Sequence, residues 1–211
     1  SLFLVTAAST AKIIPLAFLA ILYLSILVER TDVRAELLSF LFMALMITVL
    51  YRFREKYTKL IFLLIPLQLL WANSHIYFPI GILLALLFAV DLGITHRKNL
   101  TAKQPKMLFL TLIGMGIVTL INPHGLTGAL YPLTVMQNYG YTIEENQTPF
   151  FLQSLGFTKP SFLYLEIAML ILFSSLLFTI KKSRIIDWLL AIIFSIIALN
   201  AVRNFPLFVF A

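Results

Sequence analysis

Long apolar stretches, separated by short polar or basic breaks, recur along the whole sequence. Seven can be drawn, at residues 13–28, 34–51, 59–72, 76–93, 107–121, 161–180 and 185–200, and an eighth begins at Phe205. About 20 apolar residues in a helix cross the hydrocarbon core of a bilayer. Within that core only helices and closed barrels pair all their backbone polar groups. The pattern therefore predicts an all-α fold, a polytopic bundle of about seven to eight transmembrane helices.

The composition favours a membrane protein over other classes. Hydrophobic residues make up 61% of the 211 residues and charged residues only 12%, too few to cover the surface of a soluble domain. The net charge is +7, but the basic residues lie in short runs between apolar segments, which is typical of topology signals. We therefore expect no nucleic acid partner. The chain has no cysteine, which excludes disulfides and thiolate metal sites.

The basic residues also predict an orientation. Twelve of the 16 Lys and Arg residues fall on one side of the alternating segments, and this excess marks the cytoplasmic side. The four on the other side are Arg30, Arg34, Lys159 and Arg203. Asp91 and Asp187 lie at cytoplasmic ends, where we expect them beside Arg or Lys. The chain is thus predicted to be a multi-pass protein of a bacterial inner or plasma membrane, with its site facing outside.

We expect residues 1–211 to form one transmembrane domain that is a piece of a longer protein. The chain opens on Ser1 in an apolar stretch and stops at Ala211 inside the run that begins at Phe205. Several segments have only 14–17 residues. Short spans are compatible with a bundle whose irregular ends are covered by neighbouring helices.

One loop on the outer side is long. It covers residues 122–160, a length of 39 residues, and loops of this length usually carry function or are disordered. Its apolar and aromatic stretches, 126–136 and 150–157, are suited to helices that lie in the membrane interface. We therefore predict interfacial helices in this loop.

Polar residues at the outer ends of the segments are candidates for a site. Trp71, Asn73 and His75 lie between two short spans, where an Asn and a His need partners or water and so indicate a polar cavity. The alternative is that Trp71 anchors at the headgroups and Asn73 caps the next helix. His124 lies in a helix-stop sequence, residues 122–125, but is the one residue that the stop does not require. An imidazole can transfer a proton or, when charged, bind phosphate.

Glu144 and Glu145 form the only pair of adjacent acidic residues. A carboxylate in an apolar loop can act as a general acid or base, or hold a hard cation such as Mg²⁺ or Mn²⁺. Adjacent residues point in different directions on most backbones, so we expect one of the two to act. The alternative is a solvated charged turn.

Two arginines lie on the side where arginine is disfavoured. Arg34, and Arg203 with the following Asn204, are candidates to bind phosphate or carboxylate through the planar guanidinium. The alternative for Arg203 is that it only extends its side chain to the interface. Glu166 is a candidate partner for either arginine. Arg34 has nearer acidic neighbours for an ion pair: Glu29, Asp32 and Glu36.

Taken together, these motifs resemble a known class of enzymes. The set comprises Arg34–Ser39 (RAELLS), Trp71–His75 (WANSH) with Gly81, Asn122–Gly125 (NPHG), Ile143–Glu145 with Pro149, and Arg203–Phe208 (RNFPLF). Over about residues 30–211 the chain resembles bacterial membrane proteins of the GT-C glycosyltransferase class, relatives of protein mannosyltransferases and lipid A aminoarabinose transferases. It departs from the pattern at Ile76-Tyr77 and at Asn146. The acidic residue that such enzymes carry in their first outer loop has no counterpart here.

The resemblance implies a transferase that moves a sugar from a polyprenyl-phosphate donor in the lipid membrane to an acceptor on the outer face. A carboxylate would be the general base, and histidine and arginine would neutralise the departing phosphate. On this reading the catalytic residues are Glu144, Glu145 and His75. The substrate-binding residues are Arg34, Asn73, Trp71, His124, Arg203 and Asn204. No metal ligand is assigned, although Mg²⁺ or Mn²⁺ would suit the carboxylates.

Two other functions remain open at this level. One is a transporter or flippase for a lipid-linked or anionic substrate, which would need polar residues along a path across the bilayer. Here the polar residues stop at one face, which favours a one-sided site. The other is a non-catalytic subunit of an envelope-assembly complex, which would lack the acidic residue of the first outer loop.

Overall fold

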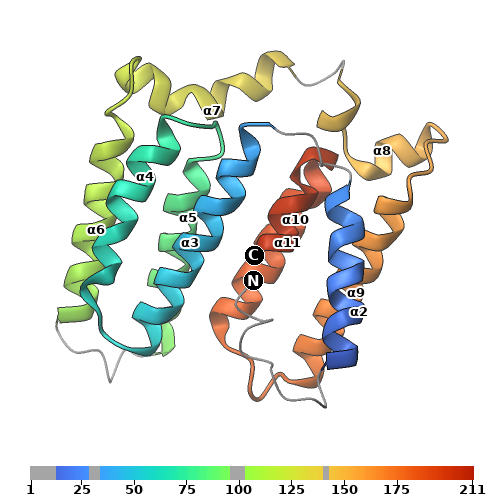
Figure 1. Ribbon diagram of the computed structural model, residues 1–211, viewed down its shortest axis with the longest axis horizontal. Helices are drawn as coiled ribbons and strands as arrows, with labels where there is room; N and C mark the ends of the chain where they lie inside the picture. The colour runs from blue at the N-terminus through green and yellow to red at the C-terminus, as the bar shows by residue number, and fades with distance from the viewer. Residues whose placement is uncertain (1–12, 29–33, 96–102, 140–142) are drawn as a thin grey trace. The chain divides into compact units, whose positions relative to one another are not determined.

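The computed structural model describes residues 13–28, 34–95, 103–139 and 143–211, and within them the chain is helical and has no β-strand. This confirms the expected all-α fold (Figure 1). The elements follow in the order α2 (Ile13–Leu27), α3 (Glu36–Glu55), η3 (Lys59–Leu63), α4 (Leu64–Ala72), α5 (Pro79–Thr95), α6 (Lys103–Thr119), α7 (Gly125–Tyr139), η4 (Glu144–Asn146), α8 (Pro149–Ser154), α9 (Pro160–Phe178), α10 (Ile185–Asn200), η5 (Val202–Asn204) and α11 (Phe205–Phe210).

Each apolar segment of the sequence corresponds to a helix, and α11 begins at Phe205 as expected. The structure supports membrane crossing for fewer helices than the sequence predicted. Among the described helices, α3 with 20 residues and α9 with 19 are long and apolar enough to cross a bilayer by themselves. Other apolar helices have only 10–17 residues, because prolines and charged residues at their ends shorten them. The sequence therefore overestimated how many helices meet this length criterion.

The chain divides into two compact units, where the sequence suggested one domain. Unit 1 contains residues 1–32, 140–183 and 187–211, and unit 2 contains residues 33–139 and 184–186. The boundary divides the long outer loop, so that α7 belongs to unit 2 and α8 to unit 1. Apolar segments in a sequence do not indicate which helices pack together, so this division could not be read from the pattern.

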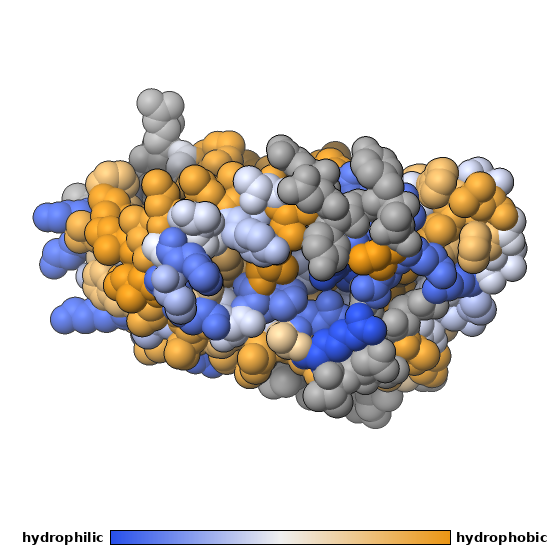
Figure 2. Space-filling model, turned by 90° about the horizontal axis from the view of Figure 1, so that it is seen from above, coloured by the Kyte–Doolittle hydropathy of each residue, from blue (hydrophilic) through white to orange (hydrophobic). Residues whose placement is uncertain are grey.

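Unit 2 is built from antiparallel helices. Helix α3 packs against α4 and α5, and α6 packs against α4 and α5 (Figure 1). Large apolar side chains such as Met43, Leu64 and Phe88 are buried between them. Helix α7 runs across the ends of α4 and α6 instead of along them. Three of its leucines, 126, 130 and 133, are exposed, and the surface over α7 is largely hydrophobic with a few polar side chains (left part of Figure 2).

Helices α4 and α5 approach closely at one glycine. A Cβ atom at Gly81 would collide with Oε1 of Gln68, so only glycine fits there without displacing that side chain. Gln68 is fully buried, and its Nε2 donates to the carbonyl oxygen of Phe78 at 3.1 Å and to Oγ1 of Thr119 at 3.2 Å. Both partners must accept here, because Thr119 gives its own proton to the carbonyl of Met115. This fixes the amide with Oε1 toward Gly81.

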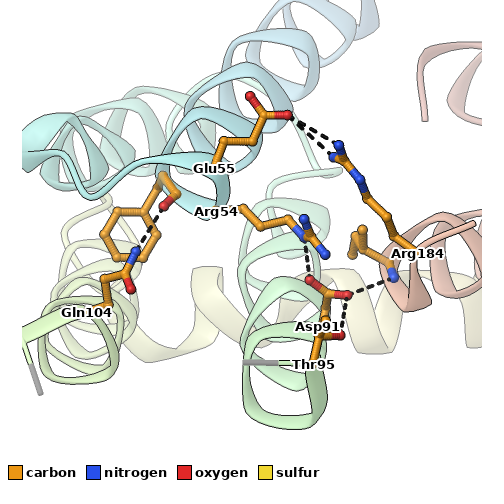
Figure 3. A network of polar contacts seen from close by, with 8 residues as sticks. Arg54, Glu55, Asp91, Thr95, Gln104 and Arg184 are labelled. Carbon is orange, nitrogen blue, oxygen red and sulfur yellow. Dashed lines mark hydrogen bonds and ion pairs between the residues drawn. The ribbon is translucent and has the colours of Figure 1, made fainter. Parts of the chain in front are cut away.

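A buried ion pair lies at the end of unit 2 where α3 and α5 end and α6 begins. We call this the basic end because it carries Arg52, Arg54, Lys56 and Lys103. Arg54 Nε donates to Asp91 Oδ2 at 2.6 Å, and the side chains are 8% and 0% exposed (Figure 3). The other oxygen of Asp91 accepts from the backbone N–H of Ile186 at 3.1 Å. The expectation that Asp91 lies beside a basic residue is confirmed. In contrast, the pair of Arg184 with Glu55, at 3.4 Å, is exposed.

Unit 1 has its own apolar core. Helices α2, α9 and α11 pack together, with Phe162 edge-on to Phe205 at a ring separation of 6.0 Å. Leu152 from α8 and Val202 from η5 complete this core. The two short outer elements, α8 and η5, are therefore anchored by side chains that insert into it.

We predict that Asp91→Asn destabilises the protein by about 3–5 kcal/mol, because it leaves the buried guanidinium of Arg54 without its counter-charge. The measurement is thermal or denaturant unfolding of the protein in detergent. The matched control is Glu55→Gln, which removes the exposed pair and should change stability by less than about 1 kcal/mol. Equal effects of the two substitutions would contradict the role of the buried pair.

Candidate functional site

A pocket of about 540 Å³ lies at the end of unit 2 opposite the basic end. It is formed by the end of α4, the following turn, the turn after α6 and the start of α7. Apolar side chains, among them Ile76, Phe78 and Tyr131, line part of it. Asn73, Ser74, His75, Asn122 and His124 supply polar groups. The cavity that the sequence predicted around residues 73–75 is thus present, and one further candidate segment, residues 122–124, shares it.

His75 is held by a chain of hydrogen bonds from the core. The indole N–H of Trp71 donates to Oγ of Ser39 at 2.8 Å, and Oγ of Ser39 lies 2.9 Å from Nδ1 of His75. The indole nitrogen can only donate, so the Ser39 oxygen accepts from it. Because the backbone N–H of Tyr77 is directed at Nδ1 of His75, at 3.4 Å, that nitrogen accepts, and the Ser39 hydroxyl donates its proton to it.

Two donors directed at Nδ1 select one form of the ring. Nδ1 acts as an acceptor, so the proton of the neutral imidazole lies on Nε2. The ring is also fixed in orientation, because it packs edge-on against Tyr77 with the ring centroids 4.8 Å apart. The arrangement therefore presents a half-buried histidine in a defined tautomer at the pocket wall.

Trp71 occupies a different place from the one expected. Its side chain is fully buried, stacks on Phe42 at a ring separation of 5.9 Å and does not line the pocket. Its role is to position Ser39 and, through it, His75.

The asparagines of the pocket are used mainly to shape it. Nδ2 of Asn73 donates to the carbonyl oxygens of Leu69 and Ile121, at 2.9 and 2.8 Å, and so ties the end of α4 to the end of α6. It does not cap α5. Asn122 bridges Thr119 and Gly125 with Nδ2, and its Oδ1 accepts from the backbone N–H of His124 at 2.9 Å.

His124 and Arg34 are both exposed. The Asn122 turn holds the backbone of His124 at the pocket edge, and Gly125 follows with a φ of 53°, a conformation that favours glycine. Arg34 lies just before α3 and does not line the pocket. Two of its proposed ion-pair partners, Glu29 and Asp32, fall outside the described residues. The third, Glu36, is buried.

The remaining candidates belong to unit 1. Glu144 and Glu145 lie on the 3₁₀ turn η4, and Arg203 and Asn204 on the 3₁₀ turn η5, which contacts η4. Nη1 of Arg203 donates to Oδ1 of Asn146 at 3.0 Å. Asn204 closes its own turn by donating to the carbonyl oxygen of Ile197 at 2.9 Å. The structure therefore groups the outer-loop carboxylates with Arg203.

Two acidic residues have partners that the sequence did not predict. Glu144, for which no partner was predicted, pairs with Lys159 at 2.8 Å. Glu166 accepts from Nε2 of Gln153 at 3.1 Å and has neither Arg34 nor Arg203 as its partner. No group of three or more His, Asp or Glu residues in the described ranges could hold a metal ion. The Mg²⁺ or Mn²⁺ hypothesis therefore still rests only on the adjacent carboxylates of Glu144 and Glu145.

Sequence reasoning did not assign roles to Ser39 and Gln68. Ser39 lies 32 residues from Trp71 and 36 from His75, and a serine inside an apolar run is common in membrane helices. The one signal was its place at the end of the RAELLS motif. Gln68 was the stronger signal, since an amide inside a short apolar segment needs partners.

Comparison of this chain with protein-family models, with curated proteins and with solved structures finds no match. Function must therefore be inferred from the residues and their geometry.

We predict that Ser39→Ala lowers stability by about 1–3 kcal/mol, because it leaves the buried Trp71 N–H without an acceptor and removes a donor to His75. It should also change the imidazole nitrogen shifts of His75, measured by NMR on protein with ¹⁵N-labelled histidine. Ser74→Ala is the control, because its hydroxyl bonds only to the carbonyl oxygen of Leu70 one turn earlier. Unchanged His75 signals in Ser39→Ala would contradict the assigned tautomer.

Proposed function

We propose that this chain is the membrane part of a transferase that moves a sugar from a polyprenyl-phosphate donor to an acceptor on the outer face of a bacterial membrane. The observation that carries the proposal is the pocket of unit 2, which combines two histidines with apolar walls at the end opposite the basic residues. The motifs that resemble GT-C glycosyltransferases supply the reaction class.

Membrane embedding of the shorter helices is supported by what they expose. On α6 the outward side chains include Phe109, Ile113 and Ile117, and on α5 they include Leu86 and Val90. In water such faces would carry polar residues, whereas lipid tails are as apolar as these side chains. We therefore propose that α5, α6 and the other apolar helices cross the membrane together with α3 and α9.

The distribution of charge within unit 2 supports a one-sided site. Arg52, Arg54 and Lys56 end α3, and Lys103 and Lys106 begin α6, whereas the pocket lies at the other end of the same helices. A helix of 20 residues is about 30 Å long, so the two ends are a membrane thickness apart. With the basic end in the cytoplasm, the pocket faces outside.

The pocket has the chemistry that an amphiphilic phosphate ester requires. Histidine N–H groups can donate to phosphate oxygens, and apolar walls suit the first isoprene units. The largely hydrophobic surface of α7 beside the pocket would keep a lipid donor at interface depth. In this proposal His75 and His124 contact the phosphate, while Trp71, Asn73 and Asn122 keep the pocket in shape.

The proposed step is a displacement at the anomeric carbon of the donor sugar. The acceptor hydroxyl oxygen forms a new bond to that carbon, the bond from carbon to the phosphate oxygen breaks, and polyprenyl phosphate leaves. A carboxylate takes the hydroxyl proton. We assign this role to one carboxylate of the acidic pair and test Glu145 for it, with Glu144, which pairs with Lys159, as the comparison. Within unit 2, hydrogen bonds from the histidines to a phosphate ester in the pocket would stabilise charge on that phosphate.

We predict opposite labelling of two single-cysteine variants, which the cysteine-free chain makes possible. Thr158→Cys, in the outer loop, should react with a membrane-impermeant maleimide in intact cells. Lys103→Cys, at the basic end, should react only after the membrane is permeabilised. Labelling of both in intact cells would contradict the proposed orientation.

We predict that Glu145→Gln lowers sugar transfer at least about 100-fold, because it removes the general base. The assay uses the full-length protein in nanodiscs with polyprenyl-phosphate sugars. Glu144→Gln is the matched control, with the same chemical change at the adjacent residue, and should retain most activity.

His75→Ala and His124→Ala should weaken binding of the polyprenyl-phosphate donor. If wild-type protein neither binds nor transfers such donors, the proposal is wrong. If it moves them across the bilayer without transferring the sugar, the transporter function is correct instead.

A further inference from the structure

Glu145 is flanked by two residues that are each held by a cation of unit 1. Nζ of Lys159 lies 2.8 Å from Oε1 of Glu144, and Nη1 of Arg203 donates to Oδ1 of Asn146 at 3.0 Å. The pair of Glu144 with Lys159 is exposed and therefore weak, so the half-buried contact of Asn146 with Arg203 is the one that fixes the turn beside residue 145. The 3₁₀ turn itself is closed by the bonds from Asn146 N to Ile143 O and from Gln147 N to Glu144 O, both 3.0 Å long.

The turn η5, which carries Arg203 and contacts η4, is itself anchored. Ala201 and Val202 are buried, and Val202 belongs to the apolar core of unit 1. The side chain of Asn204 donates back to the carbonyl of Ile197, which fixes the turn η5 on the end of α10. Arg203 therefore extends from an anchored turn, and its reach toward Asn146 does not depend on a mobile backbone.

A backbone bond joins the two turns beside the arginine. The N–H of Val202 donates to the carbonyl oxygen of Gln147 at 3.1 Å. On the other side of Gln147, Thr148 caps α8 by accepting from the N–H of Phe151, and Leu152 inserts into the core. The outer loop is thus attached to η5 at two successive residues, 146 and 147, through one side-chain and one backbone contact.

From these contacts we infer that Arg203 is a positioning residue, which fixes the turn that presents Glu145 by binding Asn146, and is not the group that binds the donor phosphate. The inference depends on the proposed function for its catalytic consequence, but its structural content is independent of it. A guanidinium already committed to an amide oxygen in a half-buried place is directed at the protein. A misplacement of about 1 Å can lower a rate about 100-fold without affecting substrate binding.

The first test is hydrogen–deuterium exchange of the full-length protein in nanodiscs without substrate. Arg203→Ala and Asn146→Leu should each speed exchange of the amides of residues 146 and 147 at least about 10-fold, since both remove the same contact. Asn146→Asp keeps an acceptor at the same position and should preserve protection. Arg184→Ala, the same substitution at an exposed pair of unit 2, is the control and should leave these amides unchanged.

Exchange in α9 and α10 reports whether each variant is folded, and Arg203→Lys, which keeps a donor, provides a milder change. The inference is overturned if the two amides keep full protection in folded Arg203→Ala or Arg203→Lys, or if Asn146→Leu has no effect where Arg203→Ala does.

The second test separates positioning from phosphate binding by kinetics. Arg203→Ala and Asn146→Leu should lower kcat for sugar transfer about 100-fold with KM for the polyprenyl-phosphate donor unchanged, and the double variant should be no worse than either single one. A raised KM in Arg203→Ala, with normal kinetics in Asn146→Leu, would identify Arg203 as a phosphate ligand and overturn the inference. If the wild-type protein transfers no sugar, the proposed function fails and the exchange experiment still decides the role of Arg203.

Discussion

The arrangement of unit 2 depends on two polar contacts that α3 makes with residues 75–95, the turn before α5 and α5 itself. At one end Arg54 pairs with Asp91, and at the other Ser39 bonds to His75. Along α3 these residues are 15 positions apart, about 22 Å in a helix, with apolar side chains between them. Apolar packing alone tolerates sliding of one helix along another, whereas a slip by one turn would break both contacts and leave a charge buried without its partner. The ion pair at the basic end therefore helps to fix the position of the pocket at the opposite end of the same helices.

Most polar side chains around the pocket hydrogen-bond to other protein groups and so maintain its structure, and few are candidates to contact a ligand. Hydrogen bonds of three residues hold the backbone and side chains around the pocket: Trp71, Ser39 and Asn73. Gln68 links α4 to the turn that precedes α5 and to α6. In a low-dielectric surrounding an unpaired polar group is expensive, so such residues are expected to be paired with one another. In the proposed function the groups that act on a ligand are few: the two histidines in unit 2 and the acidic turn in unit 1.

The sequence predicted the positions of the helices well, because apolar runs between basic or proline-containing breaks define them almost completely. It also predicted a cavity near His75 and a basic neighbour for Asp91. The contacts that the sequence did not predict are those between residues far apart along the chain. The pairing of Glu144 with Lys159, or of Arg203 with Asn146, joins residues that no periodicity relates. Trp71 was expected at a surface because tryptophan favours interfaces, but a serine on another helix accepts its N–H and permits full burial.

The close approach of α4 and α5 has a consequence for how such a chain can vary. The amide of Gln68 occupies the volume in which any side chain at residue 81 would lie, and its Oε1 is buried without a conventional donor. The Cα hydrogens of Gly81 are the groups that face it, and a weak C–H···O contact of this kind is available only to a residue without a Cβ on that side. Positions 68 and 81 are therefore coupled: a larger residue at 81 requires Gln68 to move or to be replaced by a smaller residue, together with a shift of Met46, and the bonds from the amide to Phe78 and Thr119 would then be lost.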